Sequence, residues 1–167
     1  GVKDFCDYFE AFGLQGATGI DLPAEPKKSE YYTADRMGPV ELASCAFGQS
    51  SKITPIQMIT AVCAVVNGGN LMQPYVVSDV TDSDGNIISH TDPTEVRQVV
   101  SAQTSDRCRT ILEKVVDGGT GKNAKVEGYH IGGKTGSSQT LDSKDHIIVS
   151  FLGFAPADDP EVIVLLG

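Results

Sequence analysis

The sequence is poor in positive charge and lacks long hydrophobic runs. It contains 13 Lys and Arg against 22 Asp and Glu among 167 residues, a net charge of −9. A nucleic-acid partner is therefore not expected, because contacts with phosphates require basic patches. No apolar run reaches the roughly 18–20 residues of a membrane-spanning helix, and no charged-then-apolar leader begins the chain. If the parent protein is exported, we expect its anchor to lie outside this stretch.

The cysteines and histidines are too widely spaced to indicate a metal site. They are Cys6, Cys45, Cys63, Cys108, His90, His130 and His146. No Cys-x-x-Cys, His-x-x-x-His or His-Glu-x-x-His pattern occurs, so we expect no metal and no other cofactor. Cys6, Cys63 and Cys108 occupy apolar positions of predicted helices, which predicts buried free thiols.

The composition, with 40% hydrophobic and 21% charged residues, is typical of one globular domain. Apolar periodicity predicts helices at residues 2–12, 55–67 and about 104–117. The middle helix is apolar nearly all round, and Thr54 and Gln57 form a capping box at its start. Residues 16–32 have no period and are rich in turn-forming residues, which predicts an irregular surface segment.

The remaining segments predict strands. Residues 75–81 and 86–91 flank Asp84-Gly85, a dipeptide favoured in hairpin turns. Three strands end the chain: one in the Lys-Thr-Gly segment, then residues 147–154 and 162–166, most simply an antiparallel meander. The predicted fold class is therefore α/β of the α+β type, an antiparallel sheet packed with helices.

Residues 128–139, GYHIGGKTGSSQ, concentrate a cation, hydroxyls and glycines, and they permit two interpretations. Gly128, Gly133, Lys134 and Thr135 match the phosphate-binding loop G-x-x-x-x-G-K-[ST]. That loop needs a buried strand before it and a helix starting at the lysine. The preceding residues are too polar for a central strand and the following ones are poor helix formers, so this interpretation is a weak alternative.

The second interpretation is a strand carrying Lys-Thr-Gly, the last of three motifs in serine acyltransferases that bind penicillin. Gly132 and Gly133 would let another backbone or a ligand approach closely. The charge of Lys134 and the hydroxyls of Thr135 and Ser137 would meet a carboxylate-bearing ligand that lies along the strand. A three-residue match also occurs by chance, so the residues alone leave open a glycine-rich strand with an exposed lysine.

Further stretches carry family signatures in the same order along the chain. They are Phe12-Gly13 with residues 18–25, residues 47–50 with 53–58, residues 67–69 with Pro74, Val115-Val116 with residues 119–121 and Ala124, residues 133–136 with Gln139, and residues 150–156. Together they resemble the transpeptidase domain of class B penicillin-binding proteins, the cell-wall cross-linking enzymes, including their sporulation-specific relatives. The resemblance spans essentially the whole chain and implies the penicillin-binding and serine β-lactamase-like fold.

The chain departs from the family in one important respect. The family's mechanism needs Ser-x-x-Lys and Ser-x-Asn ahead of Lys-Thr-Gly. No serine here is followed by Lys at the third position or by Asn at the second. The resemblance therefore implies that residues 1–167 are the C-terminal part of a transpeptidase domain, without the nucleophile and without the family's closing helix. We expect this chain alone to be inactive.

The resemblance implies roles for the residues of the motif. In the family a serine, activated by a nearby lysine, attacks a D-Ala-D-Ala bond or a β-lactam amide, and a second peptide's amine resolves the acyl-enzyme. Lys134 would set the electrostatics of the site. The hydroxyls of Thr135 and Ser137 would bind the terminal carboxylate, and the backbone N–H of Ser137 would be one of two oxyanion-hole donors. Gly136 and Gln139 complete the substrate-binding set, with Gln139 lining the cleft.

The implied partners are a peptidoglycan stem peptide that pairs with the strand's free edge, β-lactams, and the missing half of the domain. The implied location is the extracytoplasmic face of the bacterial cytoplasmic membrane. Incomplete cover of the helix at residues 55–67 would expose apolar surface, so we also expect self-association. Tyr129 and His130 have no implied role and are expected to pack structurally.

Three alternatives within the resemblance stay open. A class D β-lactamase and a penicillin-sensing receptor domain also carry Lys-Thr-Gly, and a non-catalytic paralogue would share the fold. The stretches Thr-Gly-Ile-Asp-Leu-Pro and Ile-Thr-Pro-Ile-Gln favour the transpeptidase over the first two.

Overall fold

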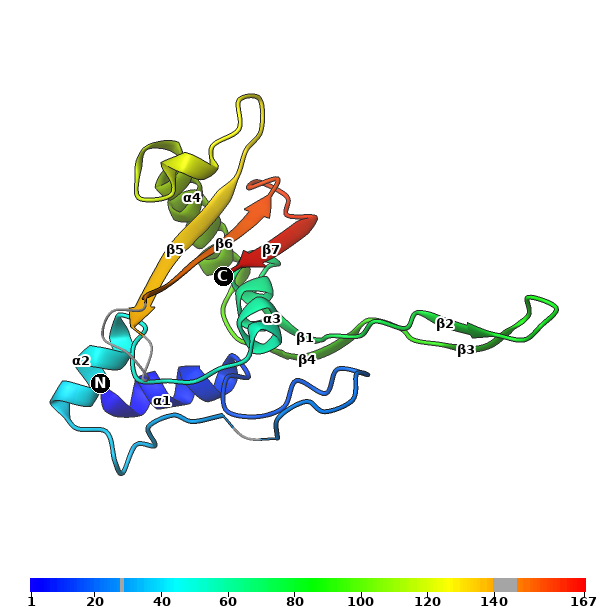
Figure 1. Ribbon diagram of the computed structural model, residues 1–167, viewed down its shortest axis with the longest axis horizontal. Helices are drawn as coiled ribbons and strands as arrows, with labels where there is room; N and C mark the ends of the chain where they lie inside the picture. Colours follow the sequence, from blue (N-terminus) through cyan, green and yellow to red (C-terminus); the bar gives the residue numbers. More distant parts are fainter. Residues whose placement is uncertain (28, 140–146) are drawn as a thin grey trace. The chain divides into compact units, whose positions relative to one another are not determined.

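The computed structural model forms two compact units, each described by itself below (Figure 1). It describes residues 1–27, 29–139 and 147–167, except for the side chain of Gln139. Unit 1 comprises Gly1–Ala64 and Asn70–Val99, and unit 2 comprises Val65–Gly69 and Val100–Gly167. Within the described ranges, no helix combines the length and apolarity needed to cross a membrane.

Unit 1 contains the helices α1 (Val2–Ala11), α2 (Pro39–Ala46) and most of α3 (Pro55–Val66). The predicted capping box of α3 is confirmed. The Thr54 N–H donates to Gln57 Oε1 at 2.8 Å, and the Gln57 N–H donates to Thr54 Oγ1 at 3.2 Å. One face of α3 is buried and its other sides are only partly covered, which is less burial than its apolar composition predicts.

Gln57 also explains how the irregular segment after α1 is held in place. Its side chain is 2% exposed, and its amide donates to the carbonyl of Gly16 at 2.6 Å and to Ser29 Oγ at 2.7 Å. A buried amide with such partners fixes backbone groups that no helix or strand satisfies. As predicted, the described part of residues 16–32 contains no helix and no strand. An isolated β-bridge joins Glu30 to Lys52.

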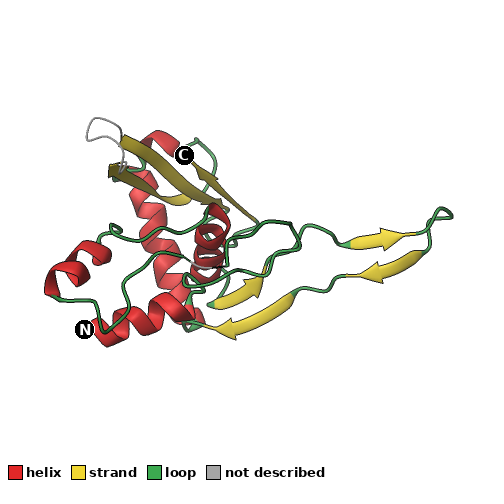
Figure 2. Cartoon of the chain, turned by 60° about the horizontal axis from the view of Figure 1, so that its bottom comes forward, coloured by secondary structure: helices red, strands yellow, loops and turns green. Residues whose placement is uncertain are grey.

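Two antiparallel strand pairs extend unit 1 (Figures 1 and 2). They are β1 (Asn70–Gln73) with β4 (Thr94–Gln98), and β2 (Asp79–Thr81) with β3 (Ile87–His90). The predicted hairpin is therefore present, with shorter strands than predicted. Asp84-Gly85 lies inside a longer turn, where one oxygen of Asp82 accepts the N–H groups of Asp84 and Asn86, both at 2.9 Å.

Unit 2 contains the predicted meander, a sheet in the order β5-β6-β7 with both pairs antiparallel. Its strands are β5 (Gly132–Gln139), β6 (Ile147–Ala155) and β7 (Val162–Leu166). The helix α4 (Ala102–Gly118) packs on the sheet, and Ser101 caps it by accepting the Thr104 N–H at 3.2 Å. Val116 and Phe154 are each 2% exposed and form the centre of this core.

All four cysteines are free, as predicted for Cys6, Cys63 and Cys108, but Cys45 is the buried one. Cys6, Cys63 and Cys108 are half-buried, so the prediction of buried thiols at these positions is wrong. For Cys6 and Cys108 the reason is the limited cover of their helices, since α1 has no buried residue and α4 has two. Burial still raises the pKa of the Cys63 thiol.

Candidate active-site strand

Lys134 and Thr135 lie inside a strand, not at the start of a helix. In β5, Lys134 pairs with Leu152 of the neighbouring strand β6, and Thr135 pairs with Phe151. The phosphate-loop interpretation is therefore wrong, because that loop presents its lysine at a helix N-terminus. Among the described strands β5 pairs only with β6, so it is an edge strand with one side open to a further partner.

The glycines of β5 are required by the neighbouring strand. A Cβ at Gly132 would lie 2.2 Å from the ring of Phe154, and one at Gly133 would lie 2.5 Å from the ring of Phe151. At Gly136 the Cβ would lie 2.6 Å from Ser150 Oγ. The sequence predicts that another backbone or a ligand approaches these glycines closely, and in the structure residues of β6 do so. The glycines therefore have a packing role whether or not a ligand binds.

Successive residues of β5 alternate between its two faces, but the Lys134 ammonium reaches its neighbour, with Nζ 3.5 Å from Thr135 Oγ1. Lys134 and Gly136 belong to one face of the strand, and Thr135 and Ser137 to the other. Lys134 and Ser137 are exposed, whereas Thr135 and Gly136 are half-buried. Lys134 Nζ donates to the Thr135 carbonyl at 2.8 Å, and no carboxylate of the described residues pairs with it. Its charge is therefore not neutralised by an acidic side chain within that part of the chain.

Thr120 is a neighbour of the motif that sequence reasoning missed. Thr135 Oγ1 donates to Thr120 Oγ1 at 3.4 Å. Thr120 lies in the turn after α4, where the N–H groups of Gly119 and Gly121 both donate to the Val115 carbonyl, at 3.1 and 3.0 Å. The Gly-Thr-Gly stretch was a usable signal, but the contact depends on how the turn folds back toward β5.

The other predicted site residues have different outcomes. Gln139 is the last residue of β5, and its side chain lies outside the described residues, so its role stays a prediction. The prediction that Tyr129 and His130 pack structurally is wrong, since both side chains are largely exposed in the segment before β5. In the described ranges, no group of three or more His, Cys, Asp and Glu side chains is placed to hold a metal ion.

His130 makes an ion pair that predicts a pH effect. Its Nδ1 lies 2.7 Å from Glu113 Oε1 of α4, and this hydrogen bond, followed by the charge of Glu113, raises the pKa of His130. The stabilisation is complete below the ordinary histidine pKa of about 6.5 and is lost as pH rises through the raised value. We expect His130→Gln to lower the urea midpoint at pH 6 and to change it little at pH 9.

The matched control is the same substitution in a Glu113→Gln background. Without the carboxylate, His130→Gln should have a similar effect at both pH values. An equal loss at pH 6 and pH 9 in the otherwise unchanged chain would contradict the ion-pair account.

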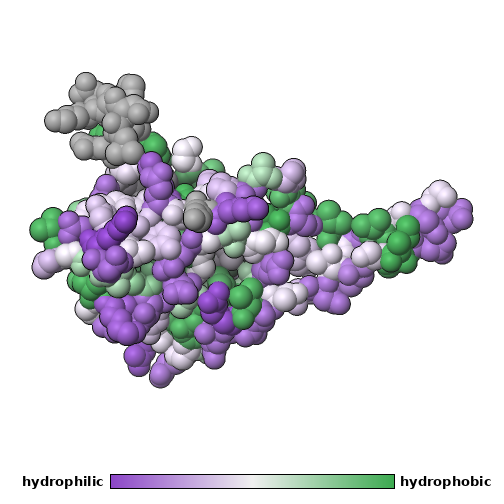
Figure 3. Space-filling model, turned by 90° about the horizontal axis from the view of Figure 1, so that it is seen from below, coloured by the Kyte–Doolittle hydropathy of each residue, from purple (hydrophilic) through white to green (hydrophobic). Residues whose placement is uncertain are grey.

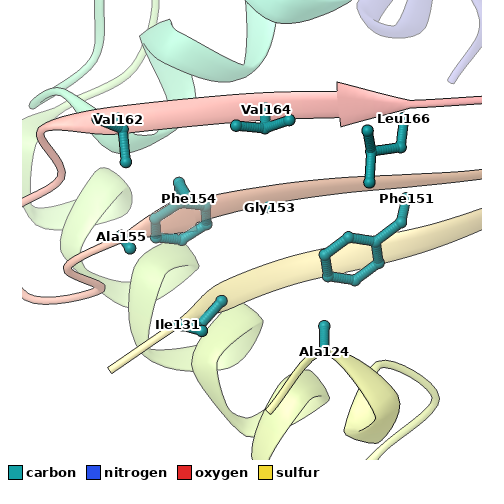
Figure 4. Close-up of a pocket in the computed structure, with 9 residues that line it drawn as sticks. All are labelled: Ala124, Ile131, Phe151, Gly153, Phe154, Ala155, Val162, Val164 and Leu166. Atoms are coloured by element: carbon teal, nitrogen blue, oxygen red, sulfur yellow. The ribbon is translucent and has the colours of Figure 1, made fainter. Parts of the chain in front are cut away.

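The sheet face opposite α4 carries an apolar groove (Figure 4). Side chains of β6 and β7 meet across this face, with Phe151 opposite Leu166 and Gly153 opposite Val164. The lining residues are Ala124, Ile131, Phe151, Gly153, Phe154, Ala155, Val162, Val164 and Leu166. Val164 and Leu166 are 52% and 62% exposed, so this face of unit 2 has little cover within the described chain.

Comparison with known proteins places the chain in a family. The penicillin binding protein transpeptidase domain matches residues 1–166. Stage V sporulation protein D of Bacillus subtilis is 44% identical over 172 residues, which cover 100% of this chain and 26% of that protein. A peptidoglycan D,D-transpeptidase FtsI homolog of Mesostigma viride is 32% identical over 143 residues, 75% of this chain and 24% of that protein.

Solved structures agree with the sequence relatives. Penicillin binding protein 3 of Mycobacterium tuberculosis, complexed with ampicillin, has a TM-score of 0.89 and 30% identity over 99% of this chain and 39% of that one. The D,D-transpeptidase domain of a peptidoglycan glycosyltransferase from Eggerthella lenta has a TM-score of 0.83 and 31% identity, covering 99% and 42%. The chain spans about a quarter of the curated relatives and about two fifths of these structures. The predicted fold is confirmed, and the chain belongs to the penicillin-binding protein transpeptidase domain family.

Proposed function

We propose that the chain is the Lys-Thr-Gly part of a serine-type D,D-transpeptidase that cross-links peptidoglycan and is acylated by β-lactams. One observation carries the proposal: the edge strand β5 presents the ammonium of Lys134 3.5 Å from the hydroxyl of Thr135, and no carboxylate of the described residues pairs with that ammonium. A carboxylate-terminated peptide that adds to this edge would gain main-chain hydrogen bonds and charge-assisted contacts. The D-Ala-D-Ala end of a stem peptide is such a ligand.

The residues of β5 divide the work of binding and catalysis. Lys134 supplies positive potential, the hydroxyls of Thr135 and Ser137 hold the substrate carboxylate, and Gly136 and Gln139 line the same strand. The backbone N–H of Ser137 is one oxyanion-hole donor, and the second comes from a nucleophilic serine that this sequence does not contain. One missing donor costs about 2.7–4 kcal/mol of transition-state stabilisation, so residues 1–167 act only as part of a larger domain.

The proposal includes where the parent protein works. Peptidoglycan stem peptides lie outside the bacterial cytoplasmic membrane, so the domain acts at the extracytoplasmic face. Residues 1–167 then form one part of the transpeptidase domain, and the part that holds the nucleophile completes it.

Two reactions of the parent protein distinguish a transpeptidase from a β-lactamase and from a sensor domain: release of a bound penicilloyl group, and transfer of a peptide to an amine. The parent is acylated with penicillin, and a donor peptide ending in D-Ala-D-Ala is supplied with an amine acceptor. We expect slow release of the penicilloyl group and formation of the transfer product. Rapid hydrolysis of penicillin would instead indicate a β-lactamase. A stable acyl-enzyme without transfer would indicate a sensor domain.

The uncovered groove of unit 2 predicts self-association of the isolated chain. Apolar surface of this kind is normally covered by protein. We expect residues 1–167 to sediment as more than a monomer at micromolar concentration, and Val164→Glu to restore the monomer. Val126→Glu is the control, because Val126 is 50% exposed, close to the 52% of Val164, but does not line the groove. A monomeric chain that binds no apolar dye would contradict this expectation.

A further inference from the structure

The hairpin of β2 and β3 exposes apolar side chains that the transpeptidase chemistry does not use. Val80, Ile87 and Ile88 are 48%, 63% and 68% exposed, and no residue of either strand is buried. Figure 3 shows apolar side chains interspersed with polar ones along this extension of unit 1. Each strand pairs only with the other among the described strands, so each keeps one open edge.

This hairpin is held at both ends by hydrogen bonds. At its base the Asp21 carboxylate accepts the N–H groups of Val76 and Val77, at 2.8 and 2.9 Å. At its tip Asp82 accepts the N–H groups of the turn, at 2.9 Å each. An isolated two-stranded ribbon is marginally stable, so these anchors are what fix its shape. A ribbon fixed in advance loses little conformational entropy when it binds a partner.

The charge of the segment limits the chemistry of that partner. Residues 74–96 contain five acidic side chains and no lysine or arginine; the acids are Asp79, Asp82, Asp84, Asp92 and Glu95. His90 offsets them only in part, with Nδ1 at 2.6 Å from Asp79 and Nε2 at 3.5 Å from Asp92. An anionic lipid surface would repel the segment. A protein segment with basic and apolar side chains complements it in both charge and hydrophobicity.

We infer that the β2–β3 hairpin is a docking element for a second protein. The occupant is an extended segment in which apolar and basic side chains alternate. Its backbone pairs with an open edge of the ribbon, its apolar side chains contact Val80, Ile87 and Ile88, and its basic side chains face the aspartates. This interaction is independent of acyl transfer and gives the transpeptidase a separate site for assembly with a partner.

A peptide titration of the full-length protein tests the chemistry. The probe is a fluorescent Lys-Val-Lys-Val-Lys-Val peptide, and Glu-Val-Glu-Val-Glu-Val is its charge-reversed counterpart. We expect binding of the first only, weaker at high salt, and reduced at least tenfold by the double variant Ile87→Ser, Ile88→Ser. Ile111→Ser is the control, since Ile111 is 60% exposed on α4. The inference would be overturned if the double variant and the Ile111→Ser control bound the lysine peptide equally, or if the protein bound both peptides.

Photo-crosslinking in cells tests the source of the occupant. With a benzoylphenylalanine at position 88 of the full-length protein, we expect crosslinks to one other protein, at a segment that contains lysine or arginine among apolar residues. Crosslinks within the protein's own chain would overturn the inference, because the hairpin would then be covered internally. Binding of the purified protein to phosphatidylglycerol vesicles through the hairpin would overturn it as well.

Discussion

Gly69→Ala is expected to lower the free energy of unfolding by about 2–5 kcal/mol. Gly69 has a φ of +101°, which costs an alanine about 1–2 kcal/mol. The added Cβ would also lie 1.9 Å from the Val100 carbonyl oxygen, an overlap that costs a further 1–3 kcal/mol or so. The carbonyl cannot retreat freely, because Val100 precedes the cap of α4 and its N–H donates to the Gly69 carbonyl at 3.4 Å.

The neighbouring glycine provides the control for this prediction. Gly68 has a φ of +95°, but a Cβ there would have nothing within 4 Å. Gly68→Ala should therefore cost only the conformational strain, about 1–2 kcal/mol. Urea unfolding followed by circular dichroism measures both. Equal losses would show that the contact with Val100 is relieved by movement of the backbone.

Lys134→Ala in the parent protein is expected to slow acylation by penicillin on the order of 100-fold. Lys134 is exposed and pairs with no acidic side chain of the described residues, so we expect it to contribute little to folding. In the proposed mechanism it interacts with the negative charge of the bound substrate and of the transition state. Loss of one such electrostatic group in an active site typically costs about 10²–10³ in rate. The second-order rate constant for labelling by a fluorescent penicillin measures the loss.

Lys114→Ala is the matched control, since Lys114 is an exposed lysine on α4. It should leave both the labelling rate and the melting temperature unchanged. Lys134→Ala should likewise melt at the same temperature as the unchanged protein, which separates a catalytic loss from unfolding. Labelling of the Lys134 variant within threefold of the unchanged rate would remove the lysine from the proposed mechanism.

Local patterns in the sequence predicted those elements whose signals lie within one segment. The capping box at Thr54 and Gln57, the periodicity of α4 and the apolar runs of β6 and β7 each depend on neighbouring residues. In contrast, β1 and β4 were missed, because neither short strand alternates and each is stabilised by a partner more than 20 residues away. The short helix α2 was missed as well, and among its residues only Cys45 is buried.

The candidate site shows the same division. Lys134, Thr135 and Ser137 could be proposed as site residues from a motif and its family context, because all three lie within one short segment of the sequence. The contact of Thr120 with Thr135 and the pair of His130 with Glu113 join separate segments, and no spacing rule predicts them. Ring contacts from Phe151 and Phe154 explain the glycines of β5, and they too are visible only once β6 is paired with β5.

The most direct test of the account is fluorescent-penicillin labelling of residues 1–167 beside the same chain extended upstream by the remainder of the domain. We predict that the extended protein is labelled and that residues 1–167 alone are not, because in the proposed mechanism the nucleophilic serine comes from outside residues 1–167. Labelling of neither protein would contradict the account, and the family membership would then describe the fold without the chemistry.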